Sequence, residues 1–343
     1  MKRRACLARA LGVLALTLPL WLQSSIASAA ARSAVRYAER AEVRQFVDEM
    51  VDRHGFVKKE LLALFGRARF QPEIIKAITP PTQARARSWQ SYRALFITPQ
   101  RIAAGAEFQT RHAEALARAA ALYGVPEEII VAIIGVETVY GRNTGSYRVI
   151  DALSTLAFDY RPRAEFFRSE LEHFLLYARD AGVDTLAVKG SFAGAIGIPQ
   201  FMPGSYRRYA VDHDGDGRQD LSGSFADAIG SVANFLKAHG WEAGQPVAFT
   251  AQARGENYRK LLDAGIKPTY RCADFASFDV AIGAEADPDA PCALIDLPTP
   301  EDATRYLAGL NNFYVLTRYN RSSMYAAAVL ELAQAVKSTN ANR

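Results

Sequence analysis

The stretch Val125–Gly141, VPEEIIVAIIGVETVYG, decides how the rest of the chain is organised. Pro126 suits the first position of a helix, and Glu127 and Glu128 put negative charge in the first turn, where the helix dipole favours it. Isoleucines then recur at helical spacing, and Glu137 takes the next position on the same apolar stripe. We expect burial to raise the pKa of this carboxyl, as a catalytic acid requires. A buried glutamate satisfied by an arginine or by main-chain N–H groups is the competing interpretation.

The chain has 343 residues, half of them hydrophobic, which is enough for a sizeable core and two or three subdomains. Residues 1–29 are expected to form a secretory signal peptide. Four basic residues lie around the start of a short apolar run, Leu11–Leu22, and Ala27-Ser28-Ala29 offers a small-residue cleavage site. The run is short for a bilayer span, so a membrane anchor is the less favoured alternative. Cys6 precedes the run and therefore does not indicate lipidation.

Removal of this segment would change both the charge and the cysteine content. The full chain has a formal charge of +5 and a pI of about 9.0, and loss of the four basic residues leaves +1. This balance gives little support for nucleic-acid binding, and we expect none. Cys272 and Cys292 would remain. In an exported protein they favour one disulfide that closes a short loop, with two free buried thiols as the alternative.

Helical spacing of apolar residues recurs along most of the chain. The expected helices lie at Val43–His54, around Leu61–Phe65, and at Pro72–Ile78, Ser88–Ile97, Pro99–Leu122, Ile150–Leu156, Arg163–Arg179 and Ser322–Val336. Short β-like runs and frequent prolines between Gln245 and Pro298 predict a small, partly β subdomain that holds the candidate disulfide. The glycines of Lys189–Ser205, KGSFAGAIGIPQFMPGS, lack phosphate-loop spacing and allow either tight packing or close approach of a ligand.

An acidic turn that begins at Asp212, DHDGDGRQD, matches the first half of a calcium-binding loop. Its twelfth position is Gly223, where such loops carry glutamate, and Asp227 is the nearest acid that could complete the ligand set. The candidate calcium ligands are the carboxylates of Asp212, Asp214, Asp216 and Asp227, the main-chain carbonyl of Arg218, and Asp220 directly or through water. An acidic Asp-Gly turn without metal is the alternative.

These stretches together resemble the family 3 lytic transglycosylases, the membrane-bound lytic murein transglycosylase B group and its soluble relatives. The resemblance covers about Ser88–Trp241 and Asn311–Val336. Its motifs are WQSYRALFI, GVPEEIIVAIIGVETVYGRNTGSYRVIDALSTLAFDY, KGSFAGAIGIPQFMPGSY, the acidic turn, DAIGSVANFLKAHGW and NFYVLTRYN. So many matches in one order are far more specific than a Glu-Thr pair with a calcium-like loop.

The resemblance implies a mainly α (α+β) fold, with a lysozyme-like helical core, an N-terminal helical subdomain and a small inserted β subdomain. On this basis the N-terminal subdomain is expected at 36–108 and the β subdomain at 245–304. The core is expected at 109–244 and 305–337, with its EF-hand-like loop at 212–227.

The resemblance also implies peptidoglycan glycan strands as the substrate and Glu137 as the single catalytic group. Protonated Glu137 would donate to the glycosidic oxygen between N-acetylmuramic acid and N-acetylglucosamine. As a carboxylate it would then take the proton of the muramyl C6 hydroxyl, which attacks C1 and closes a 1,6-anhydro ring. The second carboxylate that hydrolysis requires is unnecessary for this intramolecular attack.

Further positions match residues with which the family binds sugars. The expected substrate-binding residues are Ser191, Gln200, Tyr92, Arg163, Phe235, Tyr319 and Tyr325. Ser191 would help to hold the acetamido group or the developing charge, and the tyrosines would contact sugar faces. Phe235 stands where relatives can carry tyrosine, so a hydroxyl bond would be lost there. Pro162 replaces the first arginine of a Tyr-Pro-Arg-Arg motif, so one substrate contact of that loop is either lost or passes to Arg161.

The implied calcium ion would stabilise the core without entering the chemistry, and no organic cofactor is expected. A soluble, monomeric periplasmic enzyme is expected, with glycan strands as substrate and cell-wall synthesis or remodelling proteins as candidate partners. Two alternatives remain open. A hydrolytic muramidase would need a second acid, for which Asp151 or Asp159 are the candidates. A calcium-stabilised peptidoglycan-binding protein without turnover would retain an idle and costly Glu137.

Overall fold

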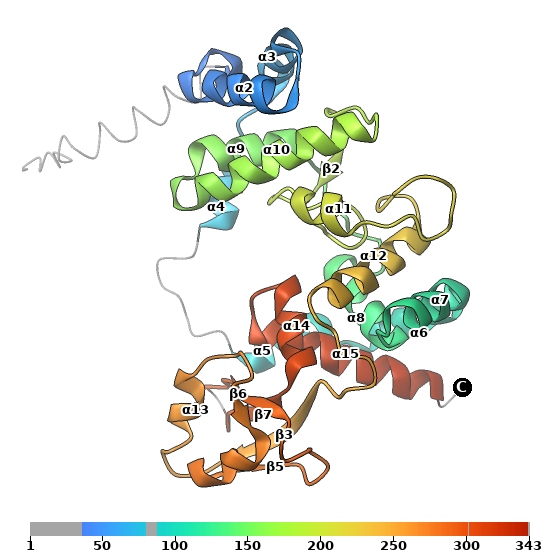
Figure 1. The fold of residues 1–343 in the computed structure, drawn as a ribbon, viewed down its shortest axis with the longest axis vertical. Helices are drawn as coiled ribbons and strands as arrows, with labels where there is room; N and C mark the ends of the chain where they lie inside the picture. Colours follow the sequence, from blue (N-terminus) through green and yellow to red (C-terminus); the bar gives the residue numbers. More distant parts are fainter. Residues whose placement is uncertain (1–35, 80–87, 301, 342–343) are drawn as a thin grey trace, which may run out of the picture. The chain divides into compact units, whose positions relative to one another are not determined.

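The computed structural model describes residues 36–79, 88–300 and 302–341. The expected signal peptide, 1–29, lies outside the described residues. The described chain forms two compact units, one that ends at Phe70 and one that begins at Gln71 (Figure 1).

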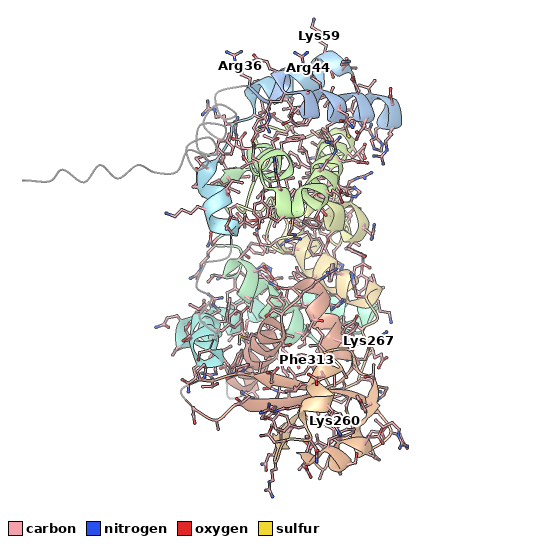
Figure 2. The ribbon with its side chains drawn as sticks, turned by 90° about the vertical axis from the view of Figure 1, so that its left-hand side faces the viewer. Arg36, Arg44, Lys59, Lys260, Lys267 and Phe313 are labelled. Atoms are coloured by element: carbon pink, nitrogen blue, oxygen red, sulfur yellow. A yellow bond between two sulfur atoms is a disulfide. The ribbon has the colours of Figure 1, made fainter. Side chains whose placement is uncertain are left out.

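The first unit is a small helical cluster. It consists of the 3₁₀ turn η1, Tyr37–Glu39, and the helices α2, Ala41–His54, and α3, Lys58–Arg67. The two helices bury apolar residues at helical spacing, and the ring of Phe46 meets that of Phe65 edge-on at 6.0 Å. Charged residues cover the outside of this unit, among them Arg36, Arg44 and Lys59 (Figure 2).

The second unit contains the remaining elements. Its helices are α4, Pro72–Ile78; α5, Trp89–Phe96; α6, Pro99–Arg111; α7, Ala113–Tyr123; α8, Glu127–Thr138; α9, Val149–Asp159; η2, Arg161–Arg163; α10, Ala164–Asp180; α11, Pro203–Tyr209; α12, Phe225–Ala238; α13, Arg259–Asp263; η3, Cys272–Phe278; α14, Asn311–Tyr319; and α15, Ser323–Ala341. Its strands are β1, Tyr147–Arg148; β2, Lys189–Gly190; β3, Ala248–Ala253; β4, Tyr270–Arg271; β5, Val280–Ile282; β6, Pro291–Leu297; and β7, Arg305–Gly309.

Helix α8 lies at the centre of the second unit. Residues 129–136 are all buried, because α6, α7, α12 and α15 pack around the helix. A helix that is apolar on every side requires such complete covering. Its last turn nevertheless carries Glu137, which is only half-buried and therefore lies at the edge of this core.

Two helix boundaries differ from the expectation. The long helix expected at Pro99–Leu122 is divided into α6 and α7 at His112, whose backbone (φ −114°, ψ 26°) is not helical. The ring of His112 packs between Phe108 and Phe225, at 4.5 and 4.8 Å, and apolar spacing does not reveal this tertiary contact. Pro126 precedes α8 as its N-cap, so the helix begins at Glu127.

The β subdomain is an antiparallel five-stranded sheet in the order β4-β6-β7-β3-β5. The expected disulfide between Cys272 and Cys292 is confirmed, and both residues are buried with Phe275 and Leu294 on one face of the sheet. Phe313 of α14 is also fully buried, whereas Lys260 and Lys267 lie on the surface (Figure 2).

Two of the expected subdomain boundaries are displaced. The central strand β7 pairs with both β3 and β6, so the sheet extends to Gly309 and does not end at 304. The described residues 71–79 and 88–108 belong to the second unit, because α4 packs on α9 while α5 and α6 pack on α15. The N-terminal unit therefore ends at Phe70, short of the expected 108.

No single helix in the described ranges is long and apolar enough to cross a membrane; α7 and α8 meet that criterion only as a pair, bent by 114°.

Candidate active site and acidic loop

The carboxyl of Glu137 lies at the end of α8 against the final helix of the chain. Its Oε1 accepts a hydrogen bond of 2.7 Å from the hydroxyl of Tyr325, near the start of α15. Burial raises the pKa of Glu137 to about 7, although the hydrogen bond from Tyr325 acts in the opposite direction. A carboxyl with this pKa exchanges a proton readily near neutral pH, which is the property that an acid–base catalyst needs.

No second carboxylate among the described residues contributes to the pKa of Glu137, which burial raises and the Tyr325 hydrogen bond lowers. Asp151, one candidate for a second acid, is buried and paired with the Arg148 guanidinium at 2.7 and 2.8 Å. Asp159, the other candidate, is the half-buried last residue of α9. The geometry therefore favours chemistry with one acid.

The end of α8 is bound to the Gly-rich segment. The hydroxyl of Thr138 donates to the carbonyl of Ile198 at 2.9 Å and accepts from the N–H of Gly141 at 3.0 Å. The next two residues, Val139 and Tyr140, both have left-handed backbone conformations. Sequence reasoning overlooked these three residues. The available signal was Gly135 inside an otherwise helical pattern, because a helical glycine often marks a close approach.

Two expected substrate-binding tyrosines, Tyr319 and Tyr325, lie near Glu137, and a third, Tyr92, lies near Tyr325. The rings of Tyr319 and Tyr325 stack at 6.2 Å and 13°, and the Tyr319 hydroxyl donates to the carbonyl of Pro199 at 2.6 Å. Burial raises the pKa of Tyr325 strongly, and the charge of Glu137 and the proximity of Tyr92 contribute in the same direction. The structure therefore brings residues of α5, α14 and α15 together around one carboxyl.

Ser191 and Gln200 both lie in the Gly-rich segment. Ser191 accepts the N–H of Ala195 at its hydroxyl, at 3.0 Å, and closes a tight turn. Gln200 has a left-handed backbone (φ 53°), and its side-chain amide donates to the carbonyls of Thr144 and Gly197 at 3.0 and 2.9 Å. Neighbouring glycines allow the chain itself to pack closely, since a Cβ atom at Gly190 would lie 2.2 Å from the carbonyl oxygen of Ala195. These contacts agree with the packing interpretation of the glycines.

The two remaining expected sugar-binding residues have different surroundings. Phe235 is 5% exposed, and its ring is enclosed by Phe201, Tyr209, Tyr319 and His239. Arg163 is exposed at the end of η2, and its guanidinium lies 4.3 Å from the ring centre of Phe166. Neither side chain has a direct hydrogen bond or ion pair with Glu137 among the described residues.

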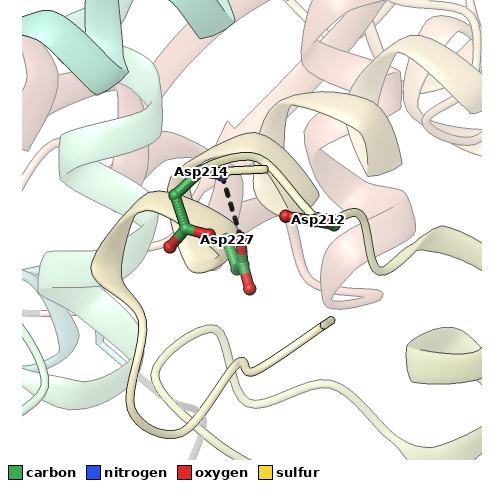
Figure 3. Close-up of side chains that lie close together, drawn as sticks. All are labelled: Asp212, Asp214 and Asp227. Atoms are coloured by element: carbon green, nitrogen blue, oxygen red, sulfur yellow. Dashed lines mark hydrogen bonds between the residues drawn. The ribbon is translucent and has the colours of Figure 1, made fainter. Parts of the chain in front are cut away.

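Three carboxylates of the acidic loop converge. Ligand oxygens of Asp212, Asp214 and Asp227 all lie within 4.8 Å of one another (Figure 3). Main-chain N–H groups shape the cluster: Asp212 accepts those of Gly215 and Gly217, and Asp227 accepts those of His213 and Asp220. Burial raises the pKa of Asp227, and the charge of Asp214 adds to this effect. Such a cluster of oxygen donors in a loop suits Ca²⁺.

Two expected ligands lie outside this cluster. Asp216 is not among the three converging acids, and its carboxylate accepts the N–H of Arg218 at 2.8 Å. The carboxylate of Asp220 likewise accepts the N–H groups of Ser222 and Gly223 in its own turn. The Ser224 hydroxyl, which caps α12, donates to Asp214 at 2.6 Å and so joins the loop to the helix.

Comparisons with known proteins add a family to this geometry. Residues 38–334 match the transglycosylase SLT domain. The chain is 43% identical over 309 residues to membrane-bound lytic murein transglycosylase B of Escherichia coli K12, covering 88% of this chain and 84% of that protein. The crystal structure of soluble lytic transglycosylase SltB1 from Pseudomonas aeruginosa is similar, with 47% identity, a TM-score of 0.82 and coverage of 88% and 99% of the two chains. A calcium complex of the Escherichia coli lytic transglycosylase Slt35 has 42% identity, a TM-score of 0.78 and coverage of 89% and 94%.

Proposed function

This chain belongs to the transglycosylase SLT domain family and is a lytic transglycosylase of peptidoglycan, and we propose that Glu137 is the single acid and base of its reaction. The observation that carries the proposal is the carboxyl at the edge of the apolar core, with a pKa of about 7 and a hydrogen bond to Tyr325. No second acid among the described residues shifts this pKa. Because the family members are enzymes, the alternative of binding without turnover is set aside.

The proposed reaction uses the carboxyl group of Glu137 twice, first as an acid and then as a base. Protonated Glu137 donates to the oxygen that links N-acetylmuramic acid to N-acetylglucosamine, and the bond from C1 to that oxygen breaks. The C6 hydroxyl of the muramyl residue then attacks C1 and loses its proton to the Glu137 carboxylate. The products are a free N-acetylglucosamine hydroxyl and a 1,6-anhydromuramyl end, and the catalytic acid is restored. The attack is intramolecular, so it competes well with water.

The residues around Glu137 support a substrate-binding role for this site. Tyr92 and Tyr319 would offer ring faces to the sugars, and Ser191 and Gln200 would offer polar atoms from the Gly-rich segment. Tyr325 is buried, so it would act through its hydrogen bond to Glu137. Arg163 and Phe235 have weaker support, because the first covers Phe166 and the second is enclosed by other rings. We therefore propose only an indirect role for Phe235, through its ring contact with Tyr319, and a peripheral role for the exposed Arg163.

The acidic loop is proposed to hold one Ca²⁺ ion for stability. Asp212, Asp214 and Asp227 supply the converging oxygens, while Asp216, Asp220 and the carbonyl of Arg218 remain additional candidates. The calcium complex of the related Slt35 is consistent with this proposal. We also propose that residues 1–29 direct export and that the enzyme acts in the periplasm as a soluble monomer on glycan strands, where wall-synthesis or remodelling proteins would meet it.

Mass spectrometry of the products from purified peptidoglycan tests the proposed chemistry. Wild type is expected to release fragments with anhydromuramyl ends, whereas Glu137→Gln, with the same unfolding temperature or a higher one, releases none. Reducing muramyl ends in place of anhydro ends would establish hydrolysis. Asp151→Asn and Asp159→Asn serve as matched controls. Loss of turnover in either folded variant would contradict a single acid.

A further inference from the structure

The backbone immediately after Glu137 is strained. Val139 and Tyr140 have φ values of 52° and 61°, and neither is glycine. A left-handed conformation is uncommon for ordinary residues and especially unfavourable for β-branched valine. Such a conformation persists only where surrounding contacts impose it. The contacts that hold this turn are therefore relevant to the catalytic carboxyl two residues earlier.

The principal contact is the buried side chain of Tyr140, which is wedged between α6 and α8. It is 7% exposed, and its hydroxyl donates to the carbonyl of Arg101 in α6 at 3.0 Å. Gly105 and Gly135 make room for it. A Cβ atom at Gly105 would lie 2.5 Å from the Tyr140 hydroxyl oxygen, and one at Gly135 would lie 2.6 Å from it. The two glycines thus leave a slot between α6 and α8 that fits the Tyr140 ring.

Arg101 joins the same two helices in the opposite direction. Its Nη1 donates to the carbonyl of Gly135 at 2.9 Å, two residues before Glu137. The same carbonyl also accepts the N–H of Val139 at 3.2 Å, and a cation near the carbonyl end of a helix is favourable because of the helix dipole. The Arg101 guanidinium nevertheless does not shift the pKa of Glu137. Arg101 therefore binds the end of α8 without lowering the raised pKa that a catalytic acid needs.

We propose that Tyr140 is a positioning residue for the reaction: by binding α6 to the end of α8, it fixes the Glu137 carboxyl against Tyr325. This inference rests on the proposed role of Glu137. Thr138 binds the same helix end to Ile198. With both contacts in place, the carboxyl stays partly shielded from water. If the Tyr140 contact is removed, the last turn can move and admit water to the carboxyl.

Tyr140→Phe tests the proposal, because it removes only the hydroxyl. We expect kcat to fall about three- to tenfold while KM changes less than about twofold, since the loss lies in orientation and not in sugar contacts. Better hydration lowers the pKa of Glu137, so the pH at which kcat/KM begins to fall on the alkaline side should decrease. Tyr306→Phe, in the β subdomain, is the matched control for loss of a tyrosine hydroxyl and should leave kcat and the pH profile unchanged.

Two further variants, Gly135→Ala alone and Gly135→Ala combined with Tyr140→Phe, test the same contact from α8. In Gly135→Ala the added Cβ would meet three atoms of Tyr140 at 2.6–2.8 Å, so the ring must move. We expect a larger fall in kcat than in Tyr140→Phe. Because both changes act through one ring, the double variant should lose less than the product of the two single effects. Independent, fully multiplicative losses would contradict the proposal.

The remaining outcomes are also decisive. A Tyr140→Phe enzyme that is less heat-stable but has an unchanged kcat and alkaline limit would show that Tyr140 is merely structural. If this variant does not fold, Arg101→Gln, which removes the donor to Gly135, takes its place with the same expected changes. Full activity of Glu137→Gln in the same assay would instead overturn the role of Glu137, whatever Tyr140 does.

Discussion

Glu137 must serve as an acid in one half of the proposed reaction and as a base in the other. Burial among apolar residues favours the protonated form, whereas the Tyr325 hydroxyl stabilises the carboxylate. The result is a pKa of about 7, at which neither form is strongly disfavoured near neutral pH. The two influences come from different residues, so substitution can separate them.

Replacing Tyr325 with phenylalanine isolates the hydrogen bond. The substitution removes a donor to the carboxylate, so the pKa of Glu137 should rise further, by roughly one unit for a bond of this type. The alkaline limit of kcat/KM, measured between about pH 5 and 9, should then move upward, while kcat falls because the carboxyl is less well oriented. A limit that moves downward would mean that the substitution mainly admits water.

Glu137 also links stability to pH. Its folded-state pKa of about 7 exceeds the ordinary value of 4.5, so the folded protein binds this proton more tightly than the unfolded chain. Stability is therefore lost as pH rises between these two values, by about 3 kcal/mol in all. Glu137→Gln avoids this loss and should unfold at a higher temperature than wild type at pH 8, with little difference at pH 4. An equal difference at both pH values would contradict the linkage.

Sequence reasoning found Glu137 because a carboxylate interrupted an apolar stripe, a local pattern that needs no tertiary information. Tyr140 could not be found in the same way. Its role depends on Gly105 and Gly135, which lie on two helices and become neighbours only after folding. The hydrogen bond between Glu137 and Tyr325 spans 188 residues, and only the family resemblance placed Tyr325 in the site.

At the scale of elements, the acidic loop illustrates what spacing can and cannot predict. The alternating acids of the turn predicted a cluster, and the carboxylate of Asp227 lies with those of Asp212 and Asp214. Asp216 belongs to the same alternation but accepts a main-chain N–H within the turn. Likewise, apolar spacing predicted helix from Pro99 onward but not the break at His112, where ring packing overrides local preference.

The loop geometry predicts unequal effects for two similar substitutions. If Ca²⁺ binds the three converging acids, it should stabilise wild type by about 2–3 kcal/mol at a hundredfold excess over its dissociation constant. Asp212→Asn should remove most of this stabilisation, whereas Asp216→Asn should retain much of it. Thermal unfolding in Ca²⁺ and in chelator measures both responses, with Mg²⁺ as the control ion. Equal losses in the two variants would mean that Asp216 moves into the ligand set.

In the second unit as a whole, the sheet is fixed to the helices that carry site residues. The N–H of Trp89, at the start of α5, donates to the carbonyl of Pro298 at 2.7 Å. The carboxylate of Glu331 in α15 pairs with Arg93 of α5 and, at 3.3 Å, with Arg305 of β7. The helices that bear Tyr92 and Tyr325 are thus joined to each other and to the β subdomain.

The disulfide lies within that sheet, so its removal tests whether the stability of the β subdomain affects catalysis. It joins residues 20 positions apart, a loop for which cross-linking contributes about 3 kcal/mol. The paired substitution Cys272→Ala with Cys292→Ala should therefore lower the free energy of unfolding by about this amount. Activity at 25 °C should change less than about twofold, because the bridge is buried with Phe275 and Leu294 and Glu137 belongs to a separate core. Wild type treated with a reductant is the matched control and should show the same loss of stability.

A large fall in kcat in the folded variant would instead show that the conformation of the sheet affects Glu137. The contacts of Glu331 with Arg93 and Arg305 would then be the route to examine.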